Sequence, residues 1–216
     1  MFIGHFAAAF AAKKIESKPG LGTYFLAAQW LDLIWPLLLL TGLEKVELAT
    51  NPNSPIPLSF THYPISHSLL AVAGWALLFA VVSYLFNKNL KVAVLLAALV
   101  ISHWVLDWFV HIPDLPLIPG SDYKTGLGLW HQKWLVLSIE LIFFGVGVLL
   151  YTRASRAINK TGAIAFYSLV IFLVLVHLLN IFGPPPTDVQ PIAIVGLSQW
   201  LLVAWAYWAD RNRKAI

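Results

Sequence analysis

Residues 102–111, "SHWVLDWFVH", combine metal-binding side chains with an apolar setting. His103, Asp107 and His111 follow one another at intervals of four residues, directly after the apolar run "VAVLLAALVI". On an α-helix, residues four apart lie above one another on one face. Two imidazoles and a carboxylate on one face can bind a metal ion or pass protons. The pattern therefore predicts chemistry inside a buried helix.

Other ionisable residues also interrupt apolar stretches. Asp32 lies in "AAQWLDLIWP", His67 in "YPISHSLL" and Glu140 in "LSIELIFF", while His5 belongs to the opening "MFIGHFAAAFAA". Moving such groups away from water is costly unless they find a partner, so they usually face a cavity or bind something. These residues need elements that bring them together.

Length and composition predict those elements. Of the 216 residues, 59% are hydrophobic and only 11% are charged, which indicates an integral membrane protein. A membrane-spanning helix needs about 20 apolar residues, and the runs lack the alternating polarity of barrel strands. We therefore expect one all-α membrane domain over residues 1–216, a bundle of six transmembrane helices. The expected spans are residues 21–43, 63–86, 92–111, 134–152, 161–182 and 191–209.

Residues 1–18 predict a separate short helix. The twelve apolar residues would form a helix about 18 Å long, which is too short to cross the membrane. Lysines follow this segment instead of preceding it, so it is not a secretory signal peptide. With Lys13 and Lys14 at the interface, His5 would lie about 12 Å inside the membrane, near the level of Asp32. We expect a half-inserted helix.

The basic residues predict the orientation. In the six-span scheme, eleven of the fourteen lysines and arginines fall on one side, and only Lys45, Lys124 and Lys133 fall on the other. Because cytoplasmic loops carry the excess of positive charge, we expect a bacterial inner-membrane protein with both termini in the cytoplasm. The net charge of +4 is then a feature of topology. It indicates membrane lipid as the partner and no nucleic acid.

The polar residues fall at similar depths. With a rise of 1.5 Å per residue from the outer helix ends, His67 lies about 6 Å deep, Asp107 about 6 to 9 Å, His103 about 12 to 15 Å and Asp32 about 16 Å. Together with His5, they predict a shared metal site in the outer half of the membrane. A proton or ion relay, or a haem held by His67 and His103, are the alternatives.

The remaining polar residues are interpreted separately. Glu140 lies about 10 to 13 Å deep and joins the layer, while His111 lies at its rim. We interpret His177 as a hydrogen-bonded core histidine, and His62 and His131 as interfacial residues. The chain has no cysteine, so any metal would be held by nitrogen and oxygen.

The order of these motifs resembles a known family. "GHFAAAFAAKK", "FLAAQWLDLIWP", "YPISHSLL", "SHWVLDWFVHIPDLPL" and "GLGLWHQKWLVLSIE" resemble, over residues 1–145, the bacterial inner-membrane family of membrane-bound metal-dependent hydrolases. That family is distantly similar to zinc-dependent phospholipase C, an all-helical enzyme with a metal cluster of histidines and acidic residues. The resemblance implies that the site residues are His5, Asp32, His67, His103 and Asp107. His131 and Glu140 are nine residues apart, and the resemblance favours Glu140 as the further residue of the site.

The residues and the resemblance together predict a hydrolase. We expect one or two divalent cations, zinc first, held by His67, His103 and Asp107, because imidazole and carboxylate suit zinc. His5 and His111 are the candidates for a second ion.

Asp32 or Glu140 is the expected general base, since burial can raise the basicity of a carboxylate. A lipid or similar amphiphile with an ester or phosphodiester bond is the expected substrate. Two alternatives remain: a transporter or channel that uses the same cluster for metal ions or protons, and a ceramidase-like zinc amidase.

Overall fold

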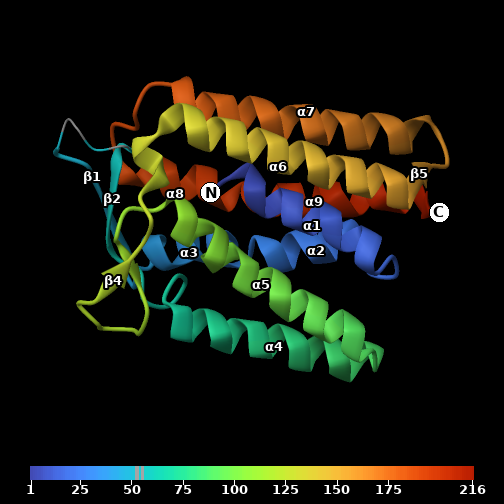
Figure 1. Ribbon diagram of the computed structural model, residues 1–216, viewed down its shortest axis with the longest axis horizontal. Coiled ribbons are helices and arrows are strands. Elements are labelled where there is room, and N and C mark those ends of the chain that lie inside the picture. Colours follow the sequence, from blue (N-terminus) through green and yellow to red (C-terminus); the bar gives the residue numbers. More distant parts are fainter. Residues whose placement is uncertain (52–53, 55) are drawn as a thin grey trace.

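The protein is a bundle of helices that run side by side along its long axis (Figure 1). The computed structural model describes residues 1–51, 54 and 56–216. Among these residues, five helical segments are long and apolar enough to cross a membrane, and one bent helix pair raises this number to six. The predicted all-α membrane bundle is confirmed. The five segments are α4 (Leu69–Asn87), α5 (Leu90–Val110), α6 (Lys133–Ala154), α7 (Lys160–Phe182), and α8 (Val189–Leu197) with α9 (Gln199–Arg211).

The bent pair is the first predicted span. Helix α2 (Leu21–Ala28) and helix α3 (Trp30–Leu40) meet at Gln29 with a bend of 56°. The predicted span over residues 21–43 thus contains two helices with a break between them. The bend does not lie at Pro36, which is inside α3. It lies where the carbonyl oxygen of Ala28 accepts a hydrogen bond from the His103 side chain, 2.7 Å away.

The second predicted span also begins later than expected. Helix α4 starts at Leu69, because Ser68 caps it by accepting a hydrogen bond from the backbone N–H of Ala71 at 3.3 Å. Residues 63–68 form a turn instead of the first helical turns, and Pro64 in this turn has no backbone N–H to donate to a helix. His67 is therefore carried by a turn.

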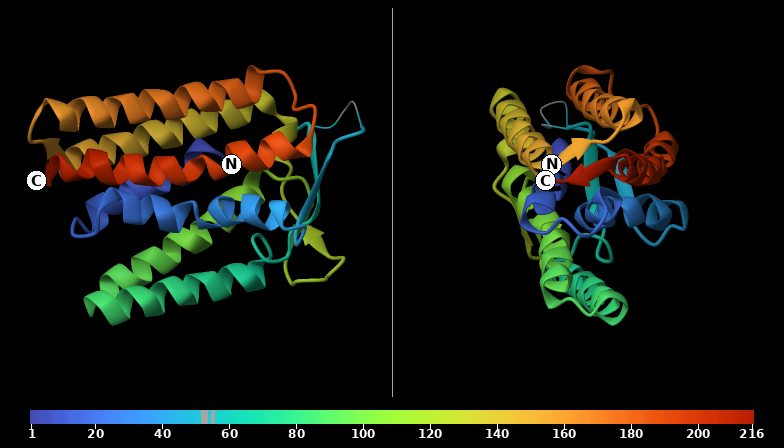
Figure 2. Two further views of the ribbon diagram at one scale, coloured as in Figure 1. Left: turned by 180° about the vertical axis from the view of Figure 1, so that it is seen from behind. Right: turned by 90° about the vertical axis from the view of Figure 1, so that its right-hand side faces the viewer.

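Helix α1 (Ile3–Ile15) lies inside the bundle, against α2, α5, α6 and α7 (Figures 1 and 2). It runs from the end that holds the C-terminus to about the middle of the molecule, which confirms the half-inserted helix. The ammonium group of Met1 is buried and bonded to Asp107. This cation is thus paired with a carboxylate within the bundle, and the cytoplasmic location of the termini stays a prediction.

A hydrogen-bonded network anchors the other end of α1. The buried Lys13 ammonium donates to Asp210 of α9 at 2.7 Å and to the carbonyl oxygen of Pro19 at 2.8 Å. Asp210 also accepts hydrogen bonds from the Tyr151 hydroxyl at 2.7 Å and the Leu21 N–H at 3.0 Å. Helices α1, α2, α6 and α9 are thereby tied together at one point.

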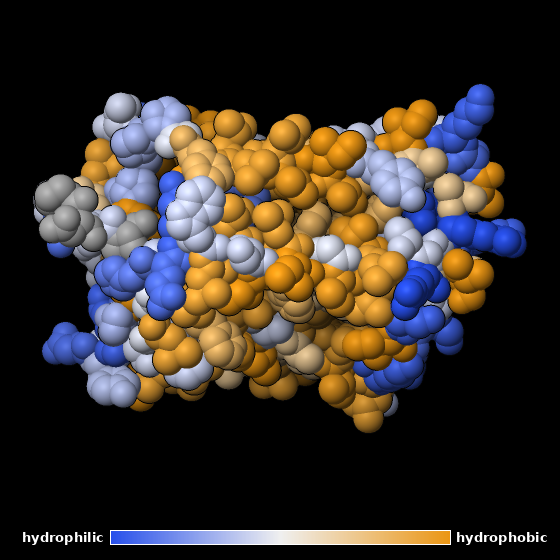
Figure 3. Space-filling view, turned by 45° about the horizontal axis from the view of Figure 1, so that its top comes forward, coloured by the Kyte–Doolittle hydropathy of each residue, from blue (hydrophilic) through white to orange (hydrophobic). Residues whose placement is uncertain are grey.

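The molecular surface divides into an apolar belt and two polar ends (Figure 3). At one end lie the final turns of α1, α4, α6 and α9 and the ladder of β5 (Ser155–Ala157) with β6 (Arg213–Ala215). The eleven basic residues of the predicted cytoplasmic side lie in these segments, in the connections after α1 and α4, and in the first turns of α5 and α7. The charge asymmetry thus follows the fold, and the assignment of that end to the cytoplasm stays a prediction.

Short strands cover the opposite end. Strand β1 (Lys45–Leu48) pairs with β2 (Leu58–His62), and β3 (Leu115–Pro116) pairs with β4 (Lys124–Thr125), both antiparallel. A 3-10 turn, η1 (Leu129–His131), leads into α6. Residues 52, 53 and 55 of the proline-rich segment between β1 and β2 lie outside the described residues.

Candidate metal centre

Five of the predicted site residues converge within the bundle. Within the described part of the chain, two three-residue groups offer ligand atoms that lie within 4.8 Å of one another. One group is His5, His103 and Asp107, and the other is Asp32, His67 and His103. They come from α1, α3, α5 and the turn before α4. Either group could hold a metal ion.

Four atoms surround a common point. The Nε2 atom of His103 lies 3.2 Å from Oδ2 of Asp107 and 3.7 Å from Oδ1 of Asp32, and Nε2 of His67 lies 3.8 Å and 3.6 Å from the same two oxygens. Three of these separations exceed a hydrogen-bond length. A tetrahedron with metal–ligand bonds of about 2.0 to 2.1 Å has edges of about 3.3 to 3.4 Å. The four nitrogen–oxygen separations are near these edges, so atoms of the cluster could bind one cation.

The break between α2 and α3 orients His103. A carbonyl oxygen can only accept, so Nδ1–H of His103 donates to Ala28 O at 2.7 Å. Ala28 is the last residue of α2, where carbonyl groups lack partners within the helix. The opposite nitrogen, Nε2, is buried without a hydrogen-bond partner among the described residues and faces the two carboxylates.

The ring of His67 is held by two residues that the sequence reasoning missed. The hydroxyl oxygen of Ser66 lies 2.7 Å from Nδ1 of His67 and 2.6 Å from Oε2 of Glu44. Glu44, which is 1% exposed, also accepts hydrogen bonds from the backbone N–H groups of Ile65 at 2.7 Å and Ser66 at 2.8 Å. Only the Ser beside His67 could have indicated this arrangement from the sequence.

His5 contacts the far side of Asp107. Its Nε2 atom lies 3.1 Å from Oδ1 of Asp107, the oxygen that also accepts from the Met1 ammonium. Its ring stacks on His103 with 3.6 Å between centroids and 3° between planes. Within the described part of the chain, Nδ1 of His5 is buried and has no partner. One Asp107 oxygen thus faces His5 and the other faces His67 and His103.

Asp32 is the most accessible carboxylate of the cluster. Its side chain is 24% exposed, against 3% for Asp107. Asp32 therefore lies at the edge of the cluster, while Asp107 lies in its interior.

His111 lies at the end of α5, outside both groups of ligand atoms among the described residues. Its Nδ1 atom lies 2.8 Å from Oδ1 of Asp114, and its ring contacts Trp130 at 3.9 Å between centroids. Its role as a ligand of a second ion stays a prediction.

Glu140 has a different set of partners from the cluster. Its Oε2 atom accepts hydrogen bonds from the backbone N–H groups of Phe2 at 2.9 Å and Gly4 at 3.3 Å. The first N–H groups of a helix have no partner within the helix, and a carboxylate there is also favoured by the helix dipole. Glu140 thus caps α1, and its predicted role as a base stays untested.

The remaining histidines lie apart from the cluster. His177 is buried, as predicted, but neither ring nitrogen has a hydrogen-bond partner within the described residues. His62 and His131 are exposed at the end covered by the strands, which agrees with their interpretation as interfacial residues. The haem alternative is disfavoured, because carboxylate oxygens lie within 3.2 to 3.8 Å of both predicted axial nitrogens, where a haem plane would pass.

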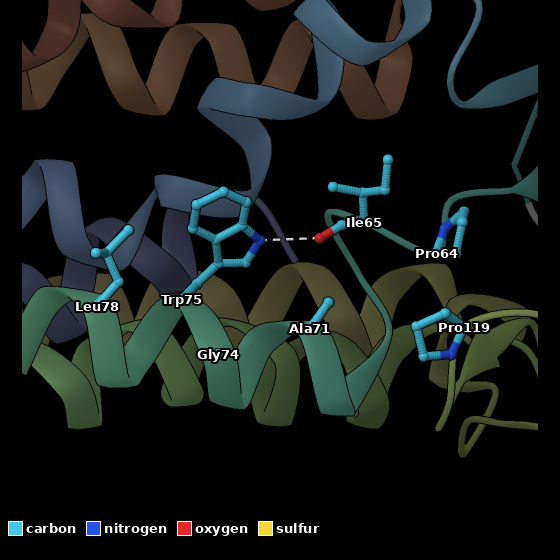
Figure 4. A pocket seen from close by; sticks show the side chains of 7 residues that line it. All are labelled: Pro64, Ile65, Ala71, Gly74, Trp75, Leu78 and Pro119. Atoms are coloured by element: carbon cyan, nitrogen blue, oxygen red, sulfur yellow. Dashed lines mark hydrogen bonds between the residues drawn. The ribbon is translucent and has the colours of Figure 1, made fainter.

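An apolar hollow lies beside the turn that carries His67 (Figure 4). Its volume is about 410 Å³. The Trp75 side chain forms one wall, and its indole N–H donates to the carbonyl oxygen of Ile65 at 2.9 Å. The lining residues are Pro64, Ile65, Ala71, Gly74, Trp75, Leu78 and Pro119.

Comparison with known proteins identifies the family. A family model described as YdjM inner membrane protein matches residues 1–182. The chain belongs to this family. The YdjM match extends from α1 to the end of α7 and includes the whole cluster. Together with the apolar helices, it establishes a multi-pass inner membrane protein. No curated protein and no solved structure matches the chain.

Proposed function

We propose that this YdjM-family protein is a metal-dependent hydrolase that acts on a lipid or a similar amphiphile within the membrane. The observation that carries the proposal is that the Nε2 atoms of His67 and His103 each lie 3.2 to 3.8 Å from carboxylate oxygens of Asp32 and Asp107. The resemblance to membrane-bound metal-dependent hydrolases, and more distantly to zinc-dependent phospholipase C, supports the reaction class.

Zinc suits this donor set, because it binds imidazole nitrogen and carboxylate oxygen in tetrahedral sites. The proposed ligands are His67, His103 and Asp107, while His5 either holds Asp107 in place or joins a second ion. A bound divalent cation would supply a Lewis acid that activates water and polarises the scissile bond.

Asp32 is the proposed general base. It is the cluster carboxylate that solvent reaches, and it lies within 3.7 Å of both histidine Nε2 atoms. A base in this position can accept a proton from a water molecule at the cluster and later return it to the leaving group. Because Glu140 already accepts two backbone hydrogen bonds at the start of α1, the structure favours Asp32 over Glu140 for this role.

The position of the cluster supports a lipid-like substrate. Asp32 lies eight residues before the end of α3, which corresponds to about 12 Å along the helix. A reactive bond at this depth belongs near the headgroup and ester region of a bilayer. The apolar hollow beside Ile65 offers a neighbouring surface for an acyl chain.

Metal content and hydrolysis test the proposal together. The purified protein should contain stoichiometric zinc by mass spectrometry, and His103→Ala should lose both the metal and the hydrolysis of ester and phosphodiester lipids in vesicles. His177→Ala removes a buried histidine outside the cluster and should change neither. A wild-type protein without bound metal, or a His103→Ala variant with normal hydrolysis, would contradict the proposal.

Transport of a metal ion or proton is the second candidate function. The 56° break in the first span and the half-inserted α1 favour it, since transporters use interrupted helices around their binding sites. Proteoliposomes would show zinc or proton uptake that Asp107→Asn abolishes, with no hydrolysis of the surrounding lipid.

A further inference from the structure

We infer that Glu44 is a positioning residue that selects the metal-binding tautomer of His67. The inference rests on the proposed metal site and adds two residues to it, Glu44 and Ser66. It follows from the directions in which the hydrogen bonds between Glu44, Ser66 and His67 can run.

The first step is to establish which groups donate the hydrogen bonds at Glu44. Three donors converge on its side chain: the backbone N–H groups of Ile65 and Ser66 on Oε1, and the Ser66 hydroxyl on Oε2. Backbone N–H groups can only donate, and the Ser66 hydroxyl donates to Oε2, so all three hydrogen bonds run toward Glu44. The hydroxyl proton of Ser66 therefore points toward Glu44.

The second step is to establish which partner receives the hydroxyl proton of Ser66. A hydroxyl has one proton, and here Glu44 takes it at 2.6 Å. Toward Nδ1 of His67, at 2.7 Å, the Ser66 oxygen can then act only as an acceptor. The proton of a neutral His67 ring must consequently reside on Nδ1.

The third step concerns the opposite side of the ring. With its proton on Nδ1, His67 presents the lone pair of Nε2 to Asp32 and Asp107, whose oxygens lie 3.6 and 3.8 Å away. The other tautomer would direct an N–H at the same point and could not bind a cation. His103 reaches the same state through the Ala28 carbonyl, so both histidines are fixed by groups that only accept.

Outer partners of this kind hold the ring orientation and tautomer of metal-binding histidines, and their loss weakens metal affinity by about 10- to 100-fold. In this protein the carboxylate does not contact the histidine directly: Ser66 lies between Glu44 and the His67 ring, and we call this series of hydrogen bonds the relay. That intermediate hydroxyl can turn around, which makes the tautomer depend on the partner behind it.

Glu44→Gln tests the direction of the relay while keeping its shape. The Gln oxygen can accept the two backbone N–H groups, which places its NH2 group against the Ser66 oxygen. Ser66 must then donate to Nδ1, and His67 takes up its proton on Nε2. We expect zinc affinity, measured by competition with a chelator, to fall about 10- to 100-fold. Nitrogen-15 NMR of the metal-free protein should show His67 changing from the Nδ1–H to the Nε2–H tautomer.

Ser66→Ala and Ser68→Ala form a matched pair for the same question. Both serines are buried and adjacent to His67, but Ser68 donates to the Pro64 carbonyl at 2.6 Å and caps α4. Ser66→Ala should weaken zinc binding and leave the His67 tautomer mixed, whereas Ser68→Ala should reduce only thermal stability. Because the pair needs no change at Glu44, it applies even if Glu44→Gln does not fold.

The outcomes separate this inference from the proposed function. Wild-type zinc affinity and an unchanged Nδ1–H tautomer in folded Glu44→Gln would overturn the role of Glu44 and leave the metal site intact. A wild-type protein that binds no zinc would overturn the proposed function, while the tautomer of its metal-free form would still test the relay.

Discussion

The close contact between α1 and α6 allows a sharp test of how the half-inserted helix is held. A Cβ atom added at Gly147 of α6 would lie 2.5 Å from the Ala7 carbonyl oxygen, 2.8 Å from Ala7 Cα and 3.0 Å from its carbonyl carbon. Optimal separations between non-bonded heavy atoms are about 3.5 to 4.0 Å. Gly147→Ala therefore requires α1 to move from α6 by about 0.5 to 1 Å, against backbone that cannot rotate aside.

The expected cost follows from this overlap. Overpacking a buried contact usually destabilises a protein by about 1 to 3 kcal/mol. In a chain of this length, each 1 kcal/mol lowers the unfolding temperature by about 2 to 4 °C, so the overlap should lower it by about 2 to 12 °C relative to a glycine-to-alanine change without such contacts. The displacement would also disturb the bond between His5 and Asp107, and zinc affinity should fall with it.

Gly145 provides the matched control on the same helix. A Cβ atom there meets nothing within 4 Å. Replacing glycine by alanine in a helix favours the helix by about 1 kcal/mol, and this gain applies to both variants. The difference in unfolding temperature between Gly147→Ala and Gly145→Ala, measured in the same detergent, thus isolates the contact with α1. Equal unfolding temperatures would refute the close packing of α1 on α6.

Three further predictions concern charge and metal. Asp107→Asn should lose zinc binding, whereas Asp210→Asn, near the opposite end of the bundle, should still bind one equivalent at saturating zinc, as measured by mass spectrometry. Lys13→Ala leaves the Asp210 charge buried without its cation and should cost about 3 to 5 kcal/mol in thermal unfolding, while Lys14→Ala, at an exposed site, should change stability by less than about 0.5 kcal/mol. Removing the metal from the wild type with a chelator should lower its unfolding temperature. Zinc at 100 times its Kd would stabilise the native state by about 2.7 kcal/mol. An unfolding temperature that changes neither on chelation nor on re-addition of zinc would argue against a resident ion.

Much of the architecture could be predicted because it depends on local sequence. The length of an apolar run reflects the thickness of the membrane, so five of the spans are found close to their predicted residues. The shared depth of His5, Asp32, His103 and Asp107 follows from counting residues along helices, and these side chains do meet. Burial of an ionisable group is costly enough that its position alone indicated a partner.

Other features could not be predicted because they depend on contacts between distant residues. The bend at Gln29 coincides with the bond between Ala28 and His103, which are 75 residues apart. Glu44 meets Ser66 only because the turn over residues 63–68 replaces the start of the expected helix. A hydropathy pattern reads both regions as part of a span, since long apolar runs adjoin Gln29 and residues 63–68.

These irregular segments and the cluster have a common physical origin. The interior of a regular helix uses its carbonyl groups for its own hydrogen bonds, and unpaired backbone groups inside a membrane are tolerated only where protein surrounds them. In the proposed metal site, two buried histidines each present a bare Nε2, and this requires acceptors at Nδ1. The end of α2 provides one through Ala28, and the turn before α4 provides the other through Ser66 and Glu44. The departures from helical regularity thus lie where the side-chain cluster needs hydrogen-bond acceptors.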